Sequence, residues 1–313
     1  MTRRHLRLGT RGSALALAQS QDVAATLTAQ LGCDVELVRV QTAGDASSAA
    51  IEQIGGTGVF VTALREALAA GEIELAVHSY KDLPTAPTDE LVVAAVPLRE
   101  DPRDALVARD RLTIGELPAG ARIGTGSPRR TAQLLGLGLG LEVVGVRGNV
   151  DTRIAKVASG KLDAVVLARA GLARLDRLGE ASEVIDPLTM LPAPAQGALA
   201  IECRAGDAEL VALLATLEDA DSRTAVTAER ALLSALEGGC TAPVAALAVV
   251  AEGSDPGDGP ELYLRGLVAA VDGTDAVRLS ATGPTSEAEK VGRRLAAELL
   301  DLGAADLMGG TRT

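Results

Sequence analysis

The chain has 313 residues and a formal net charge of −12, and it contains no tryptophan, one phenylalanine and two tyrosines. This length exceeds what one core usually serves and predicts two or three domains, with cores built from Leu, Val, Ile and Ala. The negative charge argues against nucleic acid as a partner, because phosphate binding needs a basic surface. All apolar stretches are too short to span a bilayer, so no membrane partner is expected.

Cysteine and histidine are both scarce. Cys33, Cys203 and Cys240 form no CxxC pair and are odd in number, which argues against a disulfide framework. Only two histidines are present, so no metal site is expected. The basic start and the short apolar stretch after it imitate a signal peptide, but the stretch is too short for one. We therefore expect a cytoplasmic protein.

Short apolar strands alternate with helical patterns through about residue 205, which is typical of α/β layers. The strand-like runs are residues 37–40, 91–94, 142–146 and 164–167. Segments 99–103 and 191–195, both containing proline, have the character of crossings between domains. We expect the chain to leave a first domain at the former and to return to it at the latter, so that this domain is discontinuous.

After about Asp219 the pattern changes to that of an α+β module. An amphipathic helix that Ser222 could cap leads to Cys240. Three strand-like runs then predict an antiparallel sheet: residues 244–252, 261–271 and 276–282. Residues 285–302 predict a closing helix. The predicted domains are residues 1–98 with 198–216, residues 102–192, and residues 220–313.

The glycine-rich segment 136–140 (GLGLG) imitates a nucleotide-binding loop. It follows a helical pattern and precedes a strand, whereas a dinucleotide fingerprint requires a strand followed by a helix. Leu141 also breaks the GxGxxG spacing. We interpret this segment as the end of a helix.

Cys240 lies in a turn of small residues, 236–243 (LEGGCTAP), directly after the predicted helix. Gly238 and Gly239 can adopt the left-handed conformation that ends a helix, and no bulky neighbour shields the thiol. Two interpretations are open from these residues alone. The thiol is either buried as a small hydrophobe or presented to carry a covalent group.

Four further motifs place polar residues in segments that include the ends of predicted strands. They are residues 9–19 (GTRGSALALAQ), 78–84 (HSYKDLP), 124–130 (GTGSPRR) and 147–153 (RGNVDTR). Together with the Cys240 turn, and in this order, they closely resemble the hydroxymethylbilane synthase family, also called porphobilinogen deaminases. The resemblance runs from about Leu8 to the last helix. Any one motif would be weak, but five in register are highly specific.

The resemblance implies two α/β domains, similar to those of periplasmic binding proteins, that flank a cleft, and a C-terminal α+β domain with an antiparallel sheet that presents the cysteine. It implies a transferase that joins four porphobilinogen molecules head to tail, with loss of ammonia, into the linear tetrapyrrole hydroxymethylbilane. A dipyrromethane cofactor would be attached to Cys240 through a thioether. The expected partners are porphobilinogen and the growing polypyrrole chain, and the protein is expected to be a monomer.

Asp82 matches the position of the family's catalytic aspartate. Loss of ammonia leaves an azafulvene whose positive charge spreads over the ring nitrogen. A carboxylate near the pyrrole N–H can stabilise this charge and receive the proton lost after carbon–carbon coupling. The other interpretation of Asp82 is a turn aspartate before Leu83 and Pro84. The accompanying motifs favour the catalytic role.

Each pyrrole carries an acetate and a propionate, so the site must bind many carboxylates. Arginine suits them because its planar guanidinium binds a carboxylate bidentately and keeps its charge. Besides Cys240, the positions matched to cofactor binding are Ser79, Lys81, Thr125, Ser127, Arg129, Arg130 and Arg147. Those matched to substrate binding are Arg11, Ser13, Arg153 and Arg174. A helix-surface role is also open for Arg174, and His78 is expected to pack or to orient its loop.

The chain departs from the family pattern at three places. Residues 44–58 are rich in small residues and predict a lid over the cleft. Thr57 in this segment stands where family members often have a lysine, which puts one carboxylate contact in doubt. Gly126 replaces the first residue of a Ser-Ser pair, and Ala195 the first residue of Gly-Gln-Gly-Ala.

Two other classes of function compete with the enzyme. A non-catalytic anion-binding protein with the same two-domain cleft would explain the arginines, but it would give Cys240 and Asp82 no task. A scaffold protein would show neither bound pyrrole nor turnover.

Overall fold

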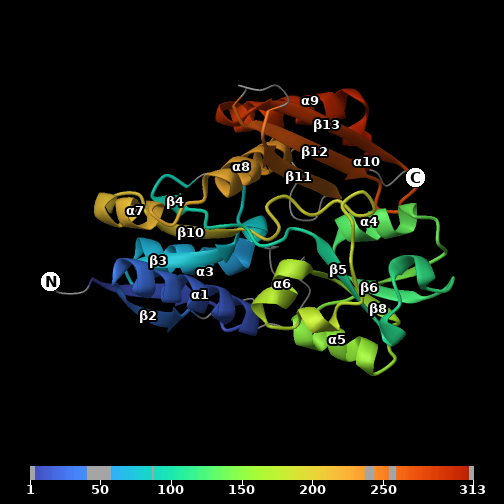
Figure 1. Ribbon diagram of the computed structural model, residues 1–313, viewed down its shortest axis with the longest axis horizontal. Helices are drawn as coiled ribbons and strands as arrows, with labels where there is room; N and C mark the ends of the chain where they lie inside the picture. The colour runs from blue at the N-terminus through green and yellow to red at the C-terminus, as the bar shows by residue number, and fades with distance from the viewer. Residues whose placement is uncertain (1–3, 41–57, 87, 237–242, 254–258, 310–313) are drawn as a thin grey trace. The chain divides into compact units, whose positions relative to one another are not determined.

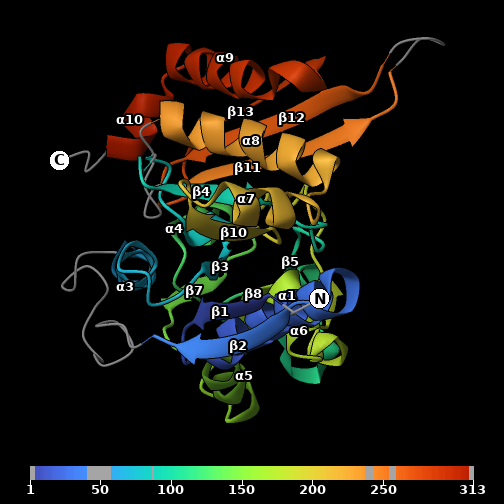
Figure 2. The ribbon, with the colours of Figure 1, turned by 90° about the vertical axis from the view of Figure 1, so that its left-hand side faces the viewer.

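The computed structural model describes residues 4–40, 58–86, 88–236, 243–253 and 259–309. The chain divides into two units, Met1–Arg99 with Ala198–Arg223, and Glu100–Gly197 with Thr224–Thr313. Figure 1 and Figure 2 label the elements of both units. The finer division into three domains stays a prediction.

The first unit is built on a mixed five-stranded sheet with the strand order β2-β1-β3-β10-β4. Its strands are β1 (His5–Thr10), β2 (Asp34–Arg39), β3 (Leu75–Ser79), β4 (Leu91–Ala95) and β10 (Leu199–Arg204). Strands β2 and β3 run parallel to β1, and β10 runs antiparallel to both β3 and β4. Successive strand residues point to opposite faces, so Leu75 packs with helices α1 (Ala14–Leu31) and α7 (Ala208–Ala215), and Ala76 packs with α3 (Gly58–Ala69).

The second unit contains a five-stranded sheet of the same design, with the order β7-β6-β8-β5-β9. Its strands are β5 (Asp104–Ala108), β6 (Arg122–Thr125), β7 (Glu142–Gly145), β8 (Ala164–Ala168) and β9 (Glu183–Val184). Strands β7 and β8 run parallel to β6, and β5 runs antiparallel to β8 and β9. Helix α4 (Pro128–Gly136) packs on one face and α5 (Val150–Ala158) on the other. The prediction of two similar α/β folds is confirmed.

The C-terminal part of the second unit is an antiparallel sheet covered by helices, as predicted. Its strands are β11 (Val244–Ala251), β12 (Glu261–Ala269) and β13 (Ala276–Pro284). Helices α8 (Ala220–Ala235) and α9 (Ala288–Asp301) share one buried core with these strands, and α10 (Ala304–Gly309) follows (Figure 2). Helices α8 and α9 approach closely at Gly292, where an added Cβ would lie 2.3 Å from the carbonyl oxygen of Ala228.

The residue that caps α8 is Asp219, and the prediction that Ser222 caps it is wrong. Oδ1 of Asp219 accepts a hydrogen bond from the backbone N–H of Ser222 at 2.8 Å. Ser222 lies in the first turn, and its hydroxyl accepts from the backbone N–H of Arg99 at 2.9 Å. Both residue types are good caps, so the sequence alone does not reveal that Ser222 has another partner.

The segment 136–140 ends a helix, as predicted. Helix α4 stops at Gly136, and Gly138 and Gly140 have φ values of 68° and 69° before β7 begins. These left-handed glycines belong to a helix-to-strand connection.

Gly197 lies where the chain leaves the second unit, in a conformation that only glycine adopts easily. Its φ is 88°, and an added Cβ would lie 2.2 Å from the carbonyl oxygen of Glu100. We expect Gly197→Ala to lower the free energy of unfolding by about 2 kcal/mol or more, because it combines backbone strain with a clash against main chain. Gly206→Ala is the matched control, since its Cβ would meet open space. Urea denaturation measures both, and equal midpoints would contradict the expectation.

Candidate active site

Two of the motifs meet at one edge of the first sheet. Segments 9–19 and 78–84 include the carboxyl ends of β1 and β3, which are parallel neighbours, and such ends gather at the same edge of a sheet. Oγ of Ser13 caps α1 by accepting from the backbone N–H of Ala16 at 3.3 Å. Nε2 of Gln19, in the first motif, donates to Oγ of Ser79 at 2.9 Å. Arg11 follows directly after β1.

Asp82 is presented by a turn that is anchored on both sides. The residues after β3 form one 3-10 turn, η2 (Tyr80–Asp82), and the backbone N–H of Tyr80 donates to the carbonyl oxygen of Ala198 at 3.0 Å. The side chains of Tyr80 and Leu83 are buried, whereas Lys81 is half-buried and Asp82 is exposed. The turn therefore holds a carboxylate at the surface on a fixed backbone.

His78 is buried next to this turn, as predicted, and it has a charged partner that the sequence did not reveal. Its Nε2 lies 3.1 Å from Oε2 of Glu202, a residue of β10. Nη2 of Arg65 donates to Oε1 of the same carboxylate at 2.8 Å. Burial raises the pKa of Glu202, but the contact with His78 and the hydrogen bonds from Arg65 outweigh this effect and lower the pKa below its ordinary value.

The arginines of the second unit follow three parallel strands. Arg129 and Arg130 follow β6, Arg147 and Arg153 follow β7, and Arg174 ends α6 (Arg169–Arg174), which follows β8. Strands β7 and β8 both pair with β6 in parallel, so these segments lie at one edge of the sheet. Arg147 is exposed, Arg153 and Arg174 are half-buried, and Arg129 and Arg130 are buried.

The polar residues of these motifs hold the loops in shape. Oγ1 of the buried Thr125 accepts from the backbone N–H of Ser127 at 3.2 Å. Nε of Arg153 donates to the carbonyl oxygen of Gly148 at 2.8 Å. Nη2 of Arg174 donates to the carbonyl oxygen of Gly197 at 2.7 Å. Arg153 and Arg174 are thus each held by a backbone carbonyl.

Asp104 binds both buried arginines, although it lies outside every sequence motif. Its carboxylate is fully buried, with Oδ1 2.7 Å from Nη2 of Arg130 and Oδ2 2.9 Å from Nη2 of Arg129. Nε2 of Gln196 also donates to Oδ1, at 2.8 Å. Burial raises the pKa of Asp104, but the two guanidinium groups and Gln196 hold it well below its usual range. A carboxylate at the start of the buried strand 104–108 is the signal that could have revealed this site.

Positive charge is in excess at this edge of the sheet. Burial lowers the pKa of Arg153, and the positive charge of Arg130 lowers it further. Burial also lowers the pKa of Arg129, although Asp104 opposes this effect. Arg130 thus lies near two further guanidinium groups, those of Arg129 and Arg153, and an anionic ligand would relieve the repulsion between them.

Several predicted features lie outside the described residues. Cys240 belongs to the segment between α8 and β11, and Thr57 and nearly all of the predicted lid belong to the segment before α3. Among the described helices, none is long and apolar enough to cross a membrane. Residues 4–40, 58–86, 88–236, 243–253 and 259–309 contain no cluster of three or more His, Cys, Asp or Glu side chains that could hold a metal ion.

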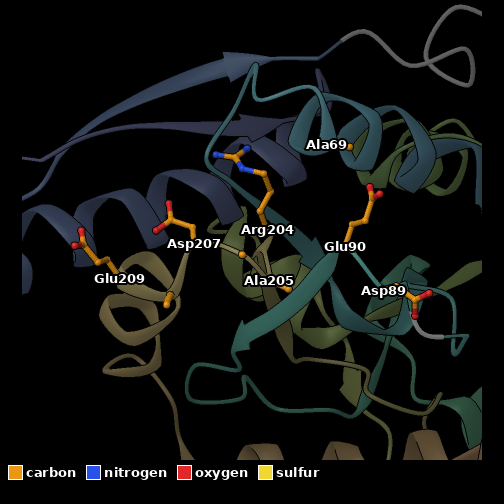
Figure 3. A pocket seen from close by; sticks show the side chains of 9 residues that line it. Ala69, Asp89, Glu90, Arg204, Ala205, Asp207 and Glu209 are labelled. Carbon is orange, nitrogen blue, oxygen red and sulfur yellow. The ribbon is translucent and has the colours of Figure 1, made fainter.

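The first unit also contains a hollow of about 830 Å³, which is lined mainly by acidic rather than basic side chains (Figure 3). The described residues that line it include Arg204 and the carboxylates of Asp89, Glu90, Asp207 and Glu209, and none of them is a predicted site residue. Arg204 already donates to the carbonyl oxygens of Leu68 and Ile73, and Asp207 caps α7. Two of the polar groups that line the hollow thus already have structural tasks.

Comparisons with known proteins agree with the motifs. A family model described as the dipyrromethane cofactor binding domain of porphobilinogen deaminase matches residues 6–212, and a model of the porphobilinogen deaminase C-terminal domain matches residues 223–301. The porphobilinogen deaminase of Mycobacterium tuberculosis (strain H37Rv) is 59% identical over 98% of this chain and 99% of its own length. That of Mycobacterium avium (strain 104) is 58% identical over 98% of each chain. This chain belongs to the porphobilinogen deaminase family.

The predictions of family, activity and cofactor are thereby confirmed. The family polymerises porphobilinogen into hydroxymethylbilane in tetrapyrrole biosynthesis, and its cofactor is dipyrromethane. Among solved structures, the periplasmic aliphatic sulphonate binding protein SsuA from Escherichia coli aligns with a TM-score of 0.40 and 15% identity, over 75% of this chain and 71% of that chain.

Proposed function

We propose that Cys240 carries the dipyrromethane cofactor of this porphobilinogen deaminase through a thioether. The other two thiols are unsuited to this task. Cys203 is fully buried, and its burial and the nearby Asp207 carboxylate raise its pKa to about 11. Cys33 is 2% exposed. Since the thiolate is the reactive form, an inaccessible thiol is a poor nucleophile. In the sequence, Cys240 instead has small neighbours, Gly238, Gly239, Thr241 and Ala242.

The arginines of the second unit fit a cofactor that bears several carboxylates. Nε of Arg129 is buried without a hydrogen-bond partner among the described residues, and Arg130 and Arg153 repel each other. Carboxylates would satisfy these donors and neutralise the excess charge. We therefore assign Arg129, Arg130 and Arg147, with Lys81, Ser79, Thr125 and Ser127, to cofactor binding. When bound, the dipyrromethane supplies the pyrrole carbon to which the first substrate unit is joined.

Asp82 is assigned the catalytic role. When porphobilinogen loses ammonia, positive charge develops on its pyrrole ring, and the exposed carboxylate of Asp82 can stabilise it. The same carboxylate can accept the proton that leaves when the new carbon–carbon bond has formed. Arg11, Ser13, Arg153 and Arg174 are assigned to the substrate carboxylates. Of these, Ser13 already caps α1, so its further role would use its remaining hydrogen-bonding capacity.

We further propose that the enzyme acts as a monomer in the cytoplasm, without nucleic acid, membrane or metal partners. The thiols of Cys33 and Cys203 are both free and buried, which suits a reducing compartment. The net charge of −12 disfavours binding to phosphate backbones.

The cofactor assignment is tested by peptide mapping of the purified active enzyme. We expect an adduct of two pyrrole units on the peptide that contains Cys240. Cys33→Ala and Cys203→Ala should each keep the adduct and the activity, although both can lower stability because they leave small cavities. An unmodified Cys240 in active enzyme would refute the assignment.

A further inference from the structure

We infer that Asp104 is a positioning residue, which fixes the guanidinium planes of Arg129 and Arg130 for an anionic ligand. This inference rests on the proposed role of these two arginines in cofactor binding. Asp104 lies at the start of β5, the strand that enters the second sheet.

The bonds of Asp104 fix both arginines in orientation as well as in place. Arg130 donates to Oδ1 from Nε at 3.2 Å and from Nη2 at 2.7 Å, and its Nη1 donates to the carbonyl oxygen of Val166 at 3.1 Å. Arg129 forms an ion pair with Oδ2 through Nη2 at 2.9 Å, and its Nη1 donates to the carbonyl oxygen of Leu191 at 2.7 Å. A planar group that is held on two sides cannot rotate. The N–H groups that remain are therefore aimed in fixed directions.

The carboxylate of Asp104 is itself held by Gln196, which directly follows the predicted crossing segment 191–195. The Nε2 amide of Gln196 donates to Oδ1 of Asp104 and to the carbonyl oxygen of Pro102, both at 2.8 Å. The carbonyl anchor of Arg129 is also fixed, because Gln133 donates to the carbonyl oxygen of Leu191 and accepts from its backbone N–H. The arrangement is thus preorganised, which reduces the cost of ordering when a ligand binds.

Asp104 could instead compete with a ligand for the two arginines, and its removal would then have the opposite effect on anion binding. If its carboxylate only competed with a ligand for the arginines, its removal would free two guanidinium groups and strengthen anion binding. If it positions them, its removal leaves Arg129, Arg130 and Arg153 to repel one another and to turn away, and binding weakens. Cofactor loading distinguishes the two roles.

The test compares Asp104→Asn with wild-type enzyme by intact mass after purification. The amide keeps the shape, but it removes the charge and can turn a donor toward Nη2 of Arg129. We expect the ratio of loaded to unloaded protein to fall roughly 10- to 100-fold, which corresponds to the loss of a charge-assisted hydrogen bond. Expression at lower temperature should restore the yield of folded protein but not the loading. Asp163→Asn is the matched control, since that carboxylate also pairs with an arginine of this unit, Arg109, but is partly exposed.

Milder variants keep the test decisive if Asp104→Asn does not fold. Asp104→Glu retains the charge and should recover part of the loading, and Gln196→Ala, which removes one support of the carboxylate but leaves both arginines and the charge in place, should lose roughly two- to fivefold. Wild-type loading of Asp104→Asn, or higher loading, would overturn the inference.

A double-mutant cycle separates positioning from general stability. If Asp104 acts through the two arginines, Asp104→Asn should lower the loading by a smaller factor in the Arg129→Ala background than in the wild type, because only Arg130 is then left for it to position. Additive losses would overturn the inference. Full loading of both Arg129→Ala and Arg130→Ala would instead refute the proposed role of the arginines, whatever the result at Asp104.

Discussion

Asp82→Asn is expected to yield a folded, cofactor-loaded enzyme whose turnover is about 10³-fold lower than that of the wild type. The amide keeps the shape of the side chain but removes the charge. At about 4 Å and an effective dielectric constant near 20, a carboxylate stabilises a unit positive charge by roughly 4 kcal/mol, and 1.36 kcal/mol corresponds to a tenfold change in rate. Single-turnover assays with porphobilinogen measure the coupling step directly.

Folding and loading must be shown to be intact for this result to concern catalysis. The side chain of Asp82 is exposed, and the turn is anchored by Tyr80 and Leu83, so urea denaturation should give a midpoint close to that of the wild type. Asp89→Asn removes another exposed carboxylate of the same unit and should leave turnover unchanged. Near-normal coupling in Asp82→Asn would show that another group stabilises the cation.

The placement of the motifs could be predicted from the sequence because it depends on local patterns. Apolar runs such as 75–77 and 164–167 identify buried strands, and polar motifs at their ends follow from the geometry of parallel sheets. Turn residues such as Gly138 and Gly140 likewise indicate their own conformation. Each of these signals lies within a few residues of the feature that it predicts.

The buried ion pairs could not be predicted in the same way. Glu202 lies in a strand of apolar residues, which indicates that it needs a partner, but the partners are 124 and 137 residues away at His78 and Arg65. Asp104 pairs with Arg129 and Arg130, whose own motif predicts only ligand binding. Such pairs form only between residues that the strand order of the sheet brings together, and this order depends on the whole chain rather than on local sequence.

Buried carboxylates fix main-chain segments within each of the two units. Asp104 holds the arginines after β6, and Glu202 holds the residue before Ser79. Glu229, also fully buried, accepts from the backbone N–H of Ala195 at 2.6 Å and from that of Ala248 at 2.8 Å. A carboxylate in the interior is tolerated only with partners of this kind: both oxygens of Glu202 and of Glu229 accept hydrogen bonds, and Asp104 combines hydrogen bonds on Oδ1 with an ion pair on Oδ2. Replacing one of these carboxylates should therefore disturb a segment as well as a contact.

Glu202→Gln is expected to lower the free energy of unfolding at neutral pH by about 3 kcal/mol, because it leaves the Arg65 side chain without its counter-charge. The carboxylate is 2% exposed, so solvent screens the interaction little. Glu74→Gln is the matched control: Glu74 pairs with Arg7 in the same unit but is 20% exposed, and a loss of about 1 kcal/mol or less is expected there. Urea denaturation of both variants measures the difference.

The stabilisation by Glu202 should depend on pH and should be lost in acid. The pKa of Glu202 is lowered in the folded protein by His78 and Arg65 against the effect of burial, so the unfolded chain binds a proton at higher pH than the folded protein does. The stabilisation is fully present above the ordinary glutamate pKa, near 4.3, and is lost as the pH falls from there through the lowered folded pKa. The gap in stability between wild type and Glu202→Gln should therefore narrow in acid. A gap that stays constant from pH 7 to pH 3 would mean that the ionised carboxylate is not what Arg65 and His78 stabilise.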